Sequence, residues 1–170
     1  ADDAFQALFA LPGGGTASLE ASRCATGWKG RHHIEVNGSL GSAWWDMEDI
    51  NRLHLLLARD FAEGLGGYRD ILVTEADHPY LAPWWPTGHV LGWEHTFTAM
   101  WRAFLIAVLD GGWDPALATF ADGLRSAEVA GAIAAAAAAG RTVTLPAGTS
   151  PPAGRKPDAG RPAASVMEDK

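Results

Sequence analysis

The sequence is poor in cysteine and in basic residues, and it contains no apolar run long enough to span a bilayer. Cys24 is the single cysteine, so no intrachain disulfide can form. We expect Cys24 to be semi-buried and the chain to work in a reducing compartment, the cytoplasm. The formal net charge of −7 leaves no basic stripe for phosphate groups, which argues against nucleic acid and anionic membranes as partners.

Signals for secretion and for dinucleotide binding are also missing. The first residues, Ala1-Asp2-Asp3, are acidic where a secretory signal is basic, and the chain is expected to be a fragment, a processed product or the second half of a longer gene. Gly13–Gly15 stands between two predicted strands, whereas a pyrophosphate site requires a helix N-terminus directly after the glycines. The sequence therefore predicts that this chain alone binds no cofactor.

Alternating apolar residues in the first half predict a series of antiparallel strands. The expected strands are 3–11, 16–23, 31–36, 43–47, 52–57 and 69–74. Asn37-Gly38 predicts a type I′ turn, because both residues tolerate the positive φ that this turn requires, and residues 39–42 allow a slightly longer connection.

The second half changes to helical spacing. Apolar residues share a helix face from Trp93 to Asp110, and a second helix is predicted over 122–139, with Asp122 as its N-cap and Gly140 after its last turn. Strands followed by helices predict an α+β fold, in which an open, mainly antiparallel sheet carries helices on one face.

The end of the chain differs in composition. A short last strand is expected at 142–145, and one folded domain is expected over 1–146. Residues 147–170 are rich in proline, glycine and alanine, which predicts a disordered tail.

The eight tryptophans are clustered rather than scattered. Trp44-Trp45 and Trp84-Trp85 are doublets, and such rings favour a core, an interface or a carbohydrate-stacking surface. On a strand, Trp44 and Trp45 face opposite ways, as do His32 and His33.

Three segments of the sequence carry a recognisable pattern: E-A-S-R-C-A-T-G-W-K-G-R-H-H-I-E-V-N-G-S-L-G-S-A-W-W-D at 20–46, H-P-Y-L-A-P-W-W-P-T-G-H-V-L-G-W-E-H-T-F at 78–97, and F-A-D-G-L-R-S-A-E-V at 120–129. These segments resemble the C-terminal domain of the Gfo/Idh/MocA oxidoreductases. Their order and spacing follow the family over residues 2–146. The resemblance implies an open antiparallel sheet that forms one wall of a sugar or polyol site and builds a homo-oligomer through its face.

The same resemblance implies NAD or NADP as the cofactor of the full-length family, bound by an N-terminal Rossmann domain. The family's G-x-G-x-x-G, its E-K-P segment with the catalytic lysine and its D-x-x-x-H segment are all absent from these residues. Hydride transfer needs a bound nicotinamide and an acid or base beside the carbinol oxygen. The resemblance therefore predicts no catalytic residue in this chain. Hydride transfer would need a Rossmann domain, which a separate chain could supply.

The predicted substrate-binding residues are Arg23, Trp85, His89 and His95. Arg23 ends the second strand and can donate to hydroxyls or phosphate, or it can be an ordinary surface arginine. Trp85 can stack on a sugar ring while His89 and His95 bind its hydroxyls. Alternatively, the histidines hydrogen-bond to the backbone of a stiff loop. The spacing of the histidines predicts no metal site.

Glu94 can serve as an acid or base, although a carboxylate in the first turn of a helix is already favoured by the helix dipole. The leading hypothesis is the substrate-side and oligomerisation domain of an NAD(P)-dependent sugar or polyol dehydrogenase. The alternatives are a non-enzymatic homodimeric scaffold or carbohydrate-binding module, and a degenerate gene remnant.

Overall fold

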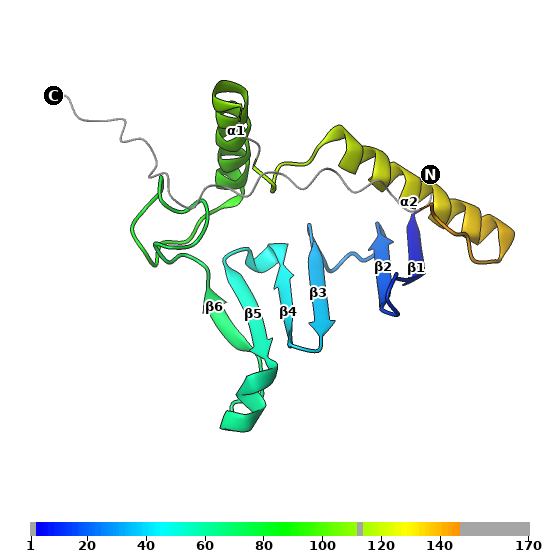
Figure 1. Ribbon diagram of the computed structural model, residues 1–170, viewed down its shortest axis with the longest axis horizontal. Helices are drawn as coiled ribbons and strands as arrows, with labels where there is room; N and C mark the ends of the chain where they lie inside the picture. The colour runs from blue at the N-terminus through cyan, green and yellow to red at the C-terminus, as the bar shows by residue number, and fades with distance from the viewer. Residues whose placement is uncertain (1–2, 112–113, 147–170) are drawn as a thin grey trace. The chain divides into compact units, whose positions relative to one another are not determined.

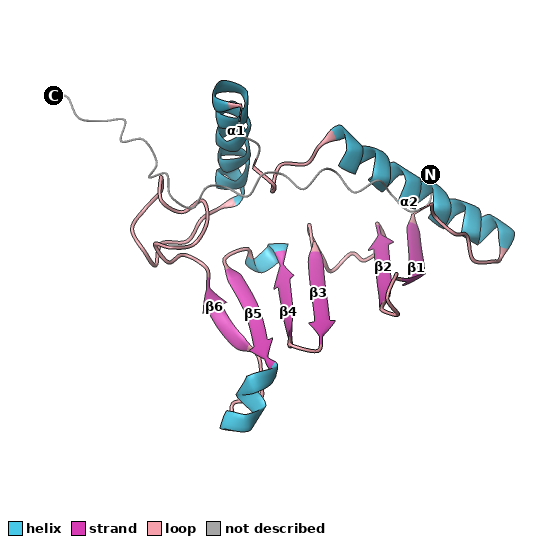
Figure 2. Cartoon of the chain, viewed as in Figure 1, coloured by secondary structure: helices cyan, strands magenta, loops and turns pink. Residues whose placement is uncertain are grey.

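The computed structural model describes residues 3–111 and 114–146. It divides into two compact units, Ala1–Thr96 and Phe97–Lys170, with the boundary inside the first helix. All β-strands belong to the first unit and the second helix belongs to the second unit (Figures 1 and 2). The predicted α+β fold, with antiparallel strands preceding two helices, is confirmed.

The first strands form a separate two-stranded hairpin, as the sequence predicts. Strand β1 spans Ala4–Ala10 and strand β2 spans Thr16–Ser22. Their turn is closed by the N–H of Leu11, which donates to the carbonyl of Gly15 over 2.8 Å. Gly13 and Gly14 have φ values of 89° and 94°, a region that glycine enters at no steric cost. The glycine cluster therefore serves a hairpin turn, and it is followed by a strand rather than by a helix.

The remaining strands form a four-stranded antiparallel sheet in sequential order (Figure 1). The strands are β3 His33–Gly38, β4 Gly41–Asp46, β5 Arg52–Leu57 and β6 Arg69–Leu72. Short 3-10 helices connect two of the pairs, η1 at Met47–Asp49 and η2 at Ala58–Glu63. The sequence predicted the strands but neither of these helices.

The turn does not lie at the predicted Asn37-Gly38 but two residues later, within the longer connection that residues 39–42 allow. Asn37 pairs with Ser42 and Gly38 pairs with Gly41, so the turn consists of residues 39 and 40. Gly41 explains this position, because a Cβ there would lie 2.2 Å from the carbonyl oxygen of Leu56 on β5. Only glycine permits strands β4 and β5 to approach so closely at this point.

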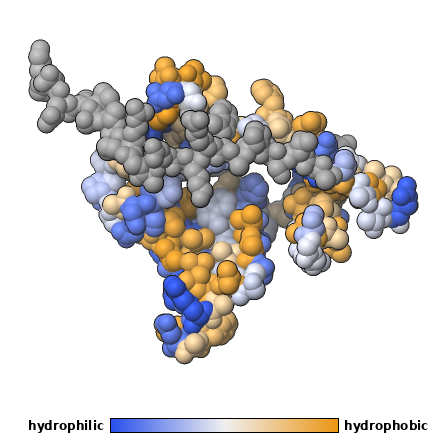
Figure 3. Space-filling model, in the orientation of Figure 1, coloured by the Kyte–Doolittle hydropathy of each residue, from blue (hydrophilic) through white to orange (hydrophobic). Residues whose placement is uncertain are grey.

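The sheet β3–β6 has one apolar face and one polar, aromatic face, because residues directly opposite in an antiparallel sheet share a face. The apolar face comprises Ile34, Val36, Ala43, Trp45, Leu53, Leu55 and Ile71. The polar face carries the row Glu35, Trp44, His54 and Asp70. The opposite orientation predicted for the tryptophan doublet is confirmed. Apolar residues gather over this sheet on the side seen in Figure 3.

The polar face is held together by ring stacking around Trp44. The ring centroids of Trp44 and His54 are 3.6 Å apart and nearly parallel, and those of Trp44 and His33 are 5.5 Å apart. Tyr68 meets Trp44 edge-on at 6.5 Å. His32 precedes β3, so the prediction that both histidines lie on one strand is wrong.

The connection between β5 and β6 is organised by a buried carboxylate. The side chain of Asp60 in η2 is only 1% exposed, and it accepts a hydrogen bond from the N–H of Leu57 over 3.0 Å. It also forms an ion pair with Arg69, whose side chain is 43% exposed. The carbonyl of Asp60 accepts from the N–H groups of Gly64 and Leu65. Asp60 therefore holds both ends of this connection.

Helix α1 spans Trp93–Asp110 and helix α2 spans Phe120–Ala139. The predicted N-cap of α2 is wrong by three residues: Thr119 is the N-cap, and Asp122 completes a reciprocal capping box from the third helical position. The Thr119 hydroxyl accepts from the N–H of Asp122, and the Asp122 carboxylate accepts from the N–H of Thr119. Gly140 ends α2 with φ 62°, as predicted.

The predicted strand at 142–145 is absent, and residues 142–146 adopt no regular structure. Arg125 of α2 binds the carbonyl of Pro146 over 3.0 Å, so a side chain holds this segment in place of a strand partner. Cys24 is exposed, and its predicted semi-buried position is wrong because it lies in a loop. The predicted tail at 147–170 lies outside the described residues. Neither described helix is long and apolar enough to cross a membrane.

Candidate functional site: the loop edge of the sheet

Three loops lie at one end of the sheet β3–β6, because β3 and β5 begin where β4 and β6 end. These loops are 23–32, 47–51 and 73–92, and we refer to them together as the loop edge (Figure 1). Arg23 lies in the first loop, Trp85 and His89 lie in the third, and His95 follows in the first turn of α1. All four predicted substrate-binding residues therefore belong to the loop edge or to the helix that leaves it.

Loop 73–92 is anchored to the sheet by Asn51. The side-chain amide of Asn51 donates to the carbonyl of Leu91, and its oxygen accepts from the N–H of Leu91, both over 2.8 Å. The backbone carbonyl of Asn51 accepts from Val73, at the other end of the loop, over 2.9 Å. One residue thus fixes both ends of the loop. The sequence did not single out Asn51, because no local pattern indicates a contact forty residues away.

Buried residues lie beneath this loop. Thr74 and Leu81 are among the few buried side chains of the described chain, and the carbonyl of Thr74 accepts from the N–H of Gly88 over 3.1 Å. Tyr80 has φ 65°, a region that costs a non-glycine residue about 1–3 kcal/mol. The loop is therefore ordered by two buried side chains of its own, Thr74 and Leu81, and it carries backbone strain at Tyr80.

His95 is oriented by the backbone and by an indole. Its Nδ1 accepts a hydrogen bond from the N–H of Gly92 over 3.0 Å, and its ring packs edge-on against Trp84 with centroids 4.5 Å apart. Because Nδ1 accepts, neutral His95 carries its proton on Nε2. Trp84 is the indole in contact with His95, and Trp85, the residue predicted to stack on a sugar, follows it in sequence. Glu94 lies beside it in the first turn of α1, where the helix dipole favours a carboxylate.

His89 has the opposite tautomer. Its Nδ1 lies 2.8 Å from the carbonyl oxygen of Pro86, which can only accept, so Nδ1 carries the proton and Nε2 is an acceptor. Trp85 is 64% exposed, so an indole face is open to a ligand. The loop therefore offers an acceptor at His89, a donor at His95 and an apolar ring surface. These groups suit a ligand that carries both C–H faces and hydroxyls.

Arg23 lies at the other side of the loop edge. Its backbone N–H donates to the carbonyl of Asp3 over 2.7 Å and so extends the β1–β2 hairpin by one pair. Arg23 itself is exposed. The backbone position is thus fixed while the guanidinium is open to solvent.

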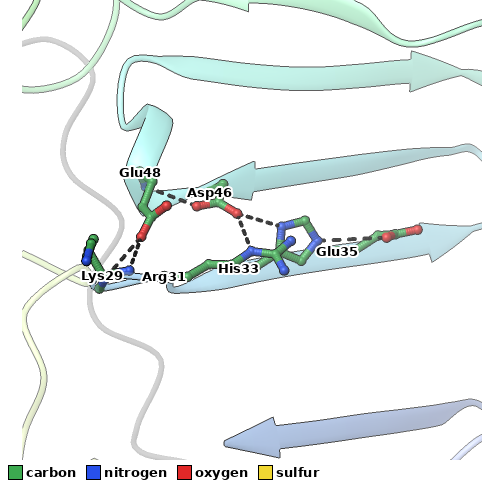
Figure 4. A network of polar contacts seen from close by, with 7 residues as sticks. Lys29, Arg31, His33, Glu35, Asp46 and Glu48 are labelled. Atoms are coloured by element: carbon green, nitrogen blue, oxygen red, sulfur yellow. Dashed lines mark hydrogen bonds and ion pairs between the residues drawn. The ribbon is translucent and has the colours of Figure 1, made fainter. Parts of the chain in front are cut away.

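A polar network joins loop 23–32 to the end of β4 (Figure 4). Asp46 accepts from Nε of Arg31 over 2.8 Å and from the N–H of Glu48 over 3.0 Å, and it lies 3.3 Å from Nδ1 of His33. The hydrogen bond from Arg31, with help from the Glu48 N–H, the Arg31 charge and His33, lowers the pKa of Asp46 and outweighs its desolvation. Glu48 accepts from the backbone N–H groups of Lys29 and Gly30 over 2.9 and 3.1 Å.

Removing the Asp46 carboxylate should change how stability responds to acid. Because folding lowers the pKa of Asp46, its contribution is present above the unfolded pKa and is lost as the pH falls through the lower folded value. We expect Asp46→Asn to unfold at lower guanidinium concentration at pH 7 and to lose less further stability than the wild type between about pH 4 and pH 2. Denaturation midpoints across this range measure the difference.

Asp49→Asn is the matched control for that experiment, because it removes a neighbouring charge in η1 but none of these hydrogen bonds. The denaturation midpoint of Asp49→Asn should change with pH in the same way as that of the wild type. An Asp46→Asn protein with the same acid dependence as the wild type would contradict the network's role.

A metal ion and a dinucleotide each need a particular set of groups from a protein. The described residues contain no group of three or more His, Cys, Asp or Glu side chains that could hold a metal ion. The one glycine cluster, Gly13–Gly15, closes a hairpin, and no helix N-terminus follows it. A nicotinamide dinucleotide therefore does not fit the glycine turn, which is where a pyrophosphate site would be sought.

Comparison with known proteins adds the chemical class. No protein-family profile matches the chain. A levoglucosan dehydrogenase from Pseudarthrobacter phenanthrenivorans is 30% identical over 146 residues, which are 85% of this chain and 36% of that protein. The solved structures that resemble this chain are also oxidoreductases. The crystal structure of an oxidoreductase domain protein from Kribbella flavida is 41% identical, with a TM-score of 0.76 over 82% of this chain and 36% of that one.

A levoglucosan dehydrogenase in complex with NADH and levoglucosan is 29% identical and has a TM-score of 0.77, over 85% of this chain and 38% of that one. The chain thus spans little more than a third of the proteins that it matches. These relatives support the oxidoreductase resemblance found in the sequence. They include NADH complexes, so the cofactor predicted for full-length relatives is observed in them.

Proposed function

We propose that this chain is the substrate-side domain of an NAD(P)-dependent sugar or polyol dehydrogenase. Its loop edge would bind and orient the carbohydrate, with Trp85 stacking on the ring, His89 accepting from a hydroxyl, and His95 and Arg23 donating. The observation that carries the proposal is the match of 85% of the chain to a levoglucosan dehydrogenase whose solved structure is a complex with NADH and levoglucosan. The exposed indole and the opposite tautomers of the two imidazoles support it.

We further propose that hydride transfer requires a cofactor-binding domain outside these residues. The described residues contain no strand, glycine turn and helix in succession, and the family's lysine segment is absent from the sequence. The contribution of this chain to the reaction is then to hold the sugar, to orient its hydroxyls and to exclude water from one side. The proposal places the protein in the cytoplasm, in keeping with its single cysteine.

Binding of levoglucosan and of NADH to the 170-residue chain tests the proposal. We expect calorimetry to detect the sugar without the dinucleotide, and we expect Trp85→Ala and His89→Gln each to weaken sugar binding about tenfold, a loss of about 1.4 kcal/mol. Trp101→Ala removes an exposed indole of α1 that the proposed site does not use, and it should leave binding unchanged. Micromolar NADH binding, or sugar binding that is insensitive to Trp85, would contradict the proposal.

We also propose that copies of the chain associate through one face of the sheet β3–β6. Ile34 and Val36 on the apolar face of β3 are both exposed, and open apolar surface of this kind favours association. Light scattering after size exclusion should show an oligomer. Val36→Glu and Asn37→Glu place the same charge on opposite faces of one strand, and we expect Val36→Glu, on the apolar face, to yield a monomer while Asn37→Glu stays oligomeric. A monomeric wild type, or two variants that both stay oligomeric, would contradict association through this sheet.

A further inference from the structure

Loop 23–32 presents a second open indole, which the site described above does not include. Trp28 is 52% exposed, and its backbone N–H donates to the carbonyl of Ala25 over 3.0 Å. The guanidinium carbon of Arg31 lies 4.1 Å from the centroid of the Trp28 ring, so the arginine covers one face of the indole. A tryptophan held in this way leaves its remaining surface to solvent, at a cost in hydrophobic free energy unless something binds there.

The position of this pair is fixed by two carboxylates of the neighbouring strand and turn. Asp46 binds Nε of Arg31, and Glu48 binds the backbone N–H groups of Lys29 and Gly30, immediately after Trp28 (Figure 4). A loop that contains Gly27 and Gly30 would otherwise lose much conformational entropy on binding a ligand. The two carboxylates have already ordered it, so a ligand would meet a preorganised surface.

The charges around the pair decide which kind of ligand it suits. The cations Lys29 and Arg31 stand against the carboxylates Asp46, Glu48 and Glu35 of the same network, so the surface has no excess positive charge for an anion. Asp46 engages Nε of Arg31, and the Nη groups have no hydrogen-bond partner among the residues that the structure describes. They can donate to hydroxyl oxygens, and the indole can stack on C–H groups.

We propose that Trp28 and Arg31 form a second carbohydrate subsite, which takes an uncharged pyranose or polyol. The indole stacks on the apolar side of the ring and the Nη groups of Arg31 donate to its hydroxyls. Asp46 is a positioning residue, because it acts on the ligand only through Arg31. The subsite lies on the same loop edge as Trp85 but depends on none of the residues of the proposed dehydrogenase site.

Sugar titrations followed on the indole N–H signals of the ¹⁵N-labelled chain test this subsite. The probes are D-glucose and D-glucuronate, which share a ring and differ by a carboxylate. We expect D-glucose to shift the Trp28 signal and D-glucuronate to bind at least about threefold more weakly, as its charge meets an acidic surface. Arg31→Gln should weaken glucose binding about fivefold, since charged donors contribute more than neutral ones. Arg52→Gln should not weaken it, although Arg52 is as exposed as Arg31 (39% against 36%) and is also ion-paired.

The Trp85→Ala background separates the subsite from the proposed function. A Trp28 signal that still shifts with glucose in this background supports the subsite, even if levoglucosan no longer binds at the other loop. A Trp28 signal that does not move with glucose in the wild type, while Arg31→Gln lowers stability only, would show that the pair is purely structural. Tighter binding of glucuronate than of glucose would overturn the assignment to uncharged ligands.

Discussion

Replacing Arg69 with methionine is expected to lower the free energy of unfolding by about 3–5 kcal/mol, the usual cost of leaving one partner of a buried ion pair without its counter-charge. Asp60 is the buried partner, with 1% of its side chain exposed, and Arg69 is its only ion-pair partner among the described residues. Methionine keeps the apolar stem but leaves Oδ1 of Asp60 unpaired. Guanidinium denaturation of the full chain, followed by tryptophan fluorescence, measures the loss.

The reverse change should cost less, because the two partners differ in exposure. In Asp60→Asn, Arg69 is left without its carboxylate but is 43% exposed, so water solvates it, and we expect a loss of about 1–3 kcal/mol. Arg52→Met breaks an ion pair between two exposed side chains and should cost less than about 1 kcal/mol. A loss in Arg69→Met no larger than that in Arg52→Met would show that the Asp60 pair does not stabilise the β5–β6 connection.

Replacing Asn51 with alanine should have the second largest effect, on stability and on ligand binding together. The change removes two hydrogen bonds of 2.8 Å and leaves the N–H and the carbonyl of Leu91 without their partner. We expect a loss of about 2–3 kcal/mol, because partly buried backbone groups lose their partners. Loop 73–92 should also become sensitive to protease, and levoglucosan should bind more weakly, since this loop carries Trp85 and His89.

Asn37→Ala is the matched control for Asn51→Ala. The side chain of Asn37 binds the exposed carboxylate of Glu35, two residues away, so its removal should change stability by less than about 0.5 kcal/mol. Equal proteolysis of loop 73–92 in the two variants would show that Asn51 does not anchor the loop. Unchanged sugar affinity in Asn51→Ala would show that the order of loop 73–92 does not contribute to sugar binding.

The same polar contacts show how far a binding site can be predicted from sequence. Residue type and the resemblance predict Arg23, Trp85, His89 and His95 as substrate-binding residues. The structure places them at one end of the sheet or beside it, and their role in binding stays a prediction. The tautomers of His89 and His95 could not be predicted, because each depends on which backbone group lies against Nδ1. The sequence did not indicate a role for Trp28. Its packing against Arg31 depends on Asp46, which lies on another strand and binds that arginine.

The sequence by itself determined the α+β class, the strand order along the chain and both ends of helix α1, because period-two and period-3.6 patterns and glycine stops act over a few residues. The tertiary structure alone decided the turn at residues 39 and 40, the burial of Asp60 and the anchoring of loop 73–92 by Asn51. Each depends on a contact between residues that are distant in sequence or in neighbouring strands. Such contacts are selected by packing and hydrogen bonding in three dimensions, and no local pattern encodes them.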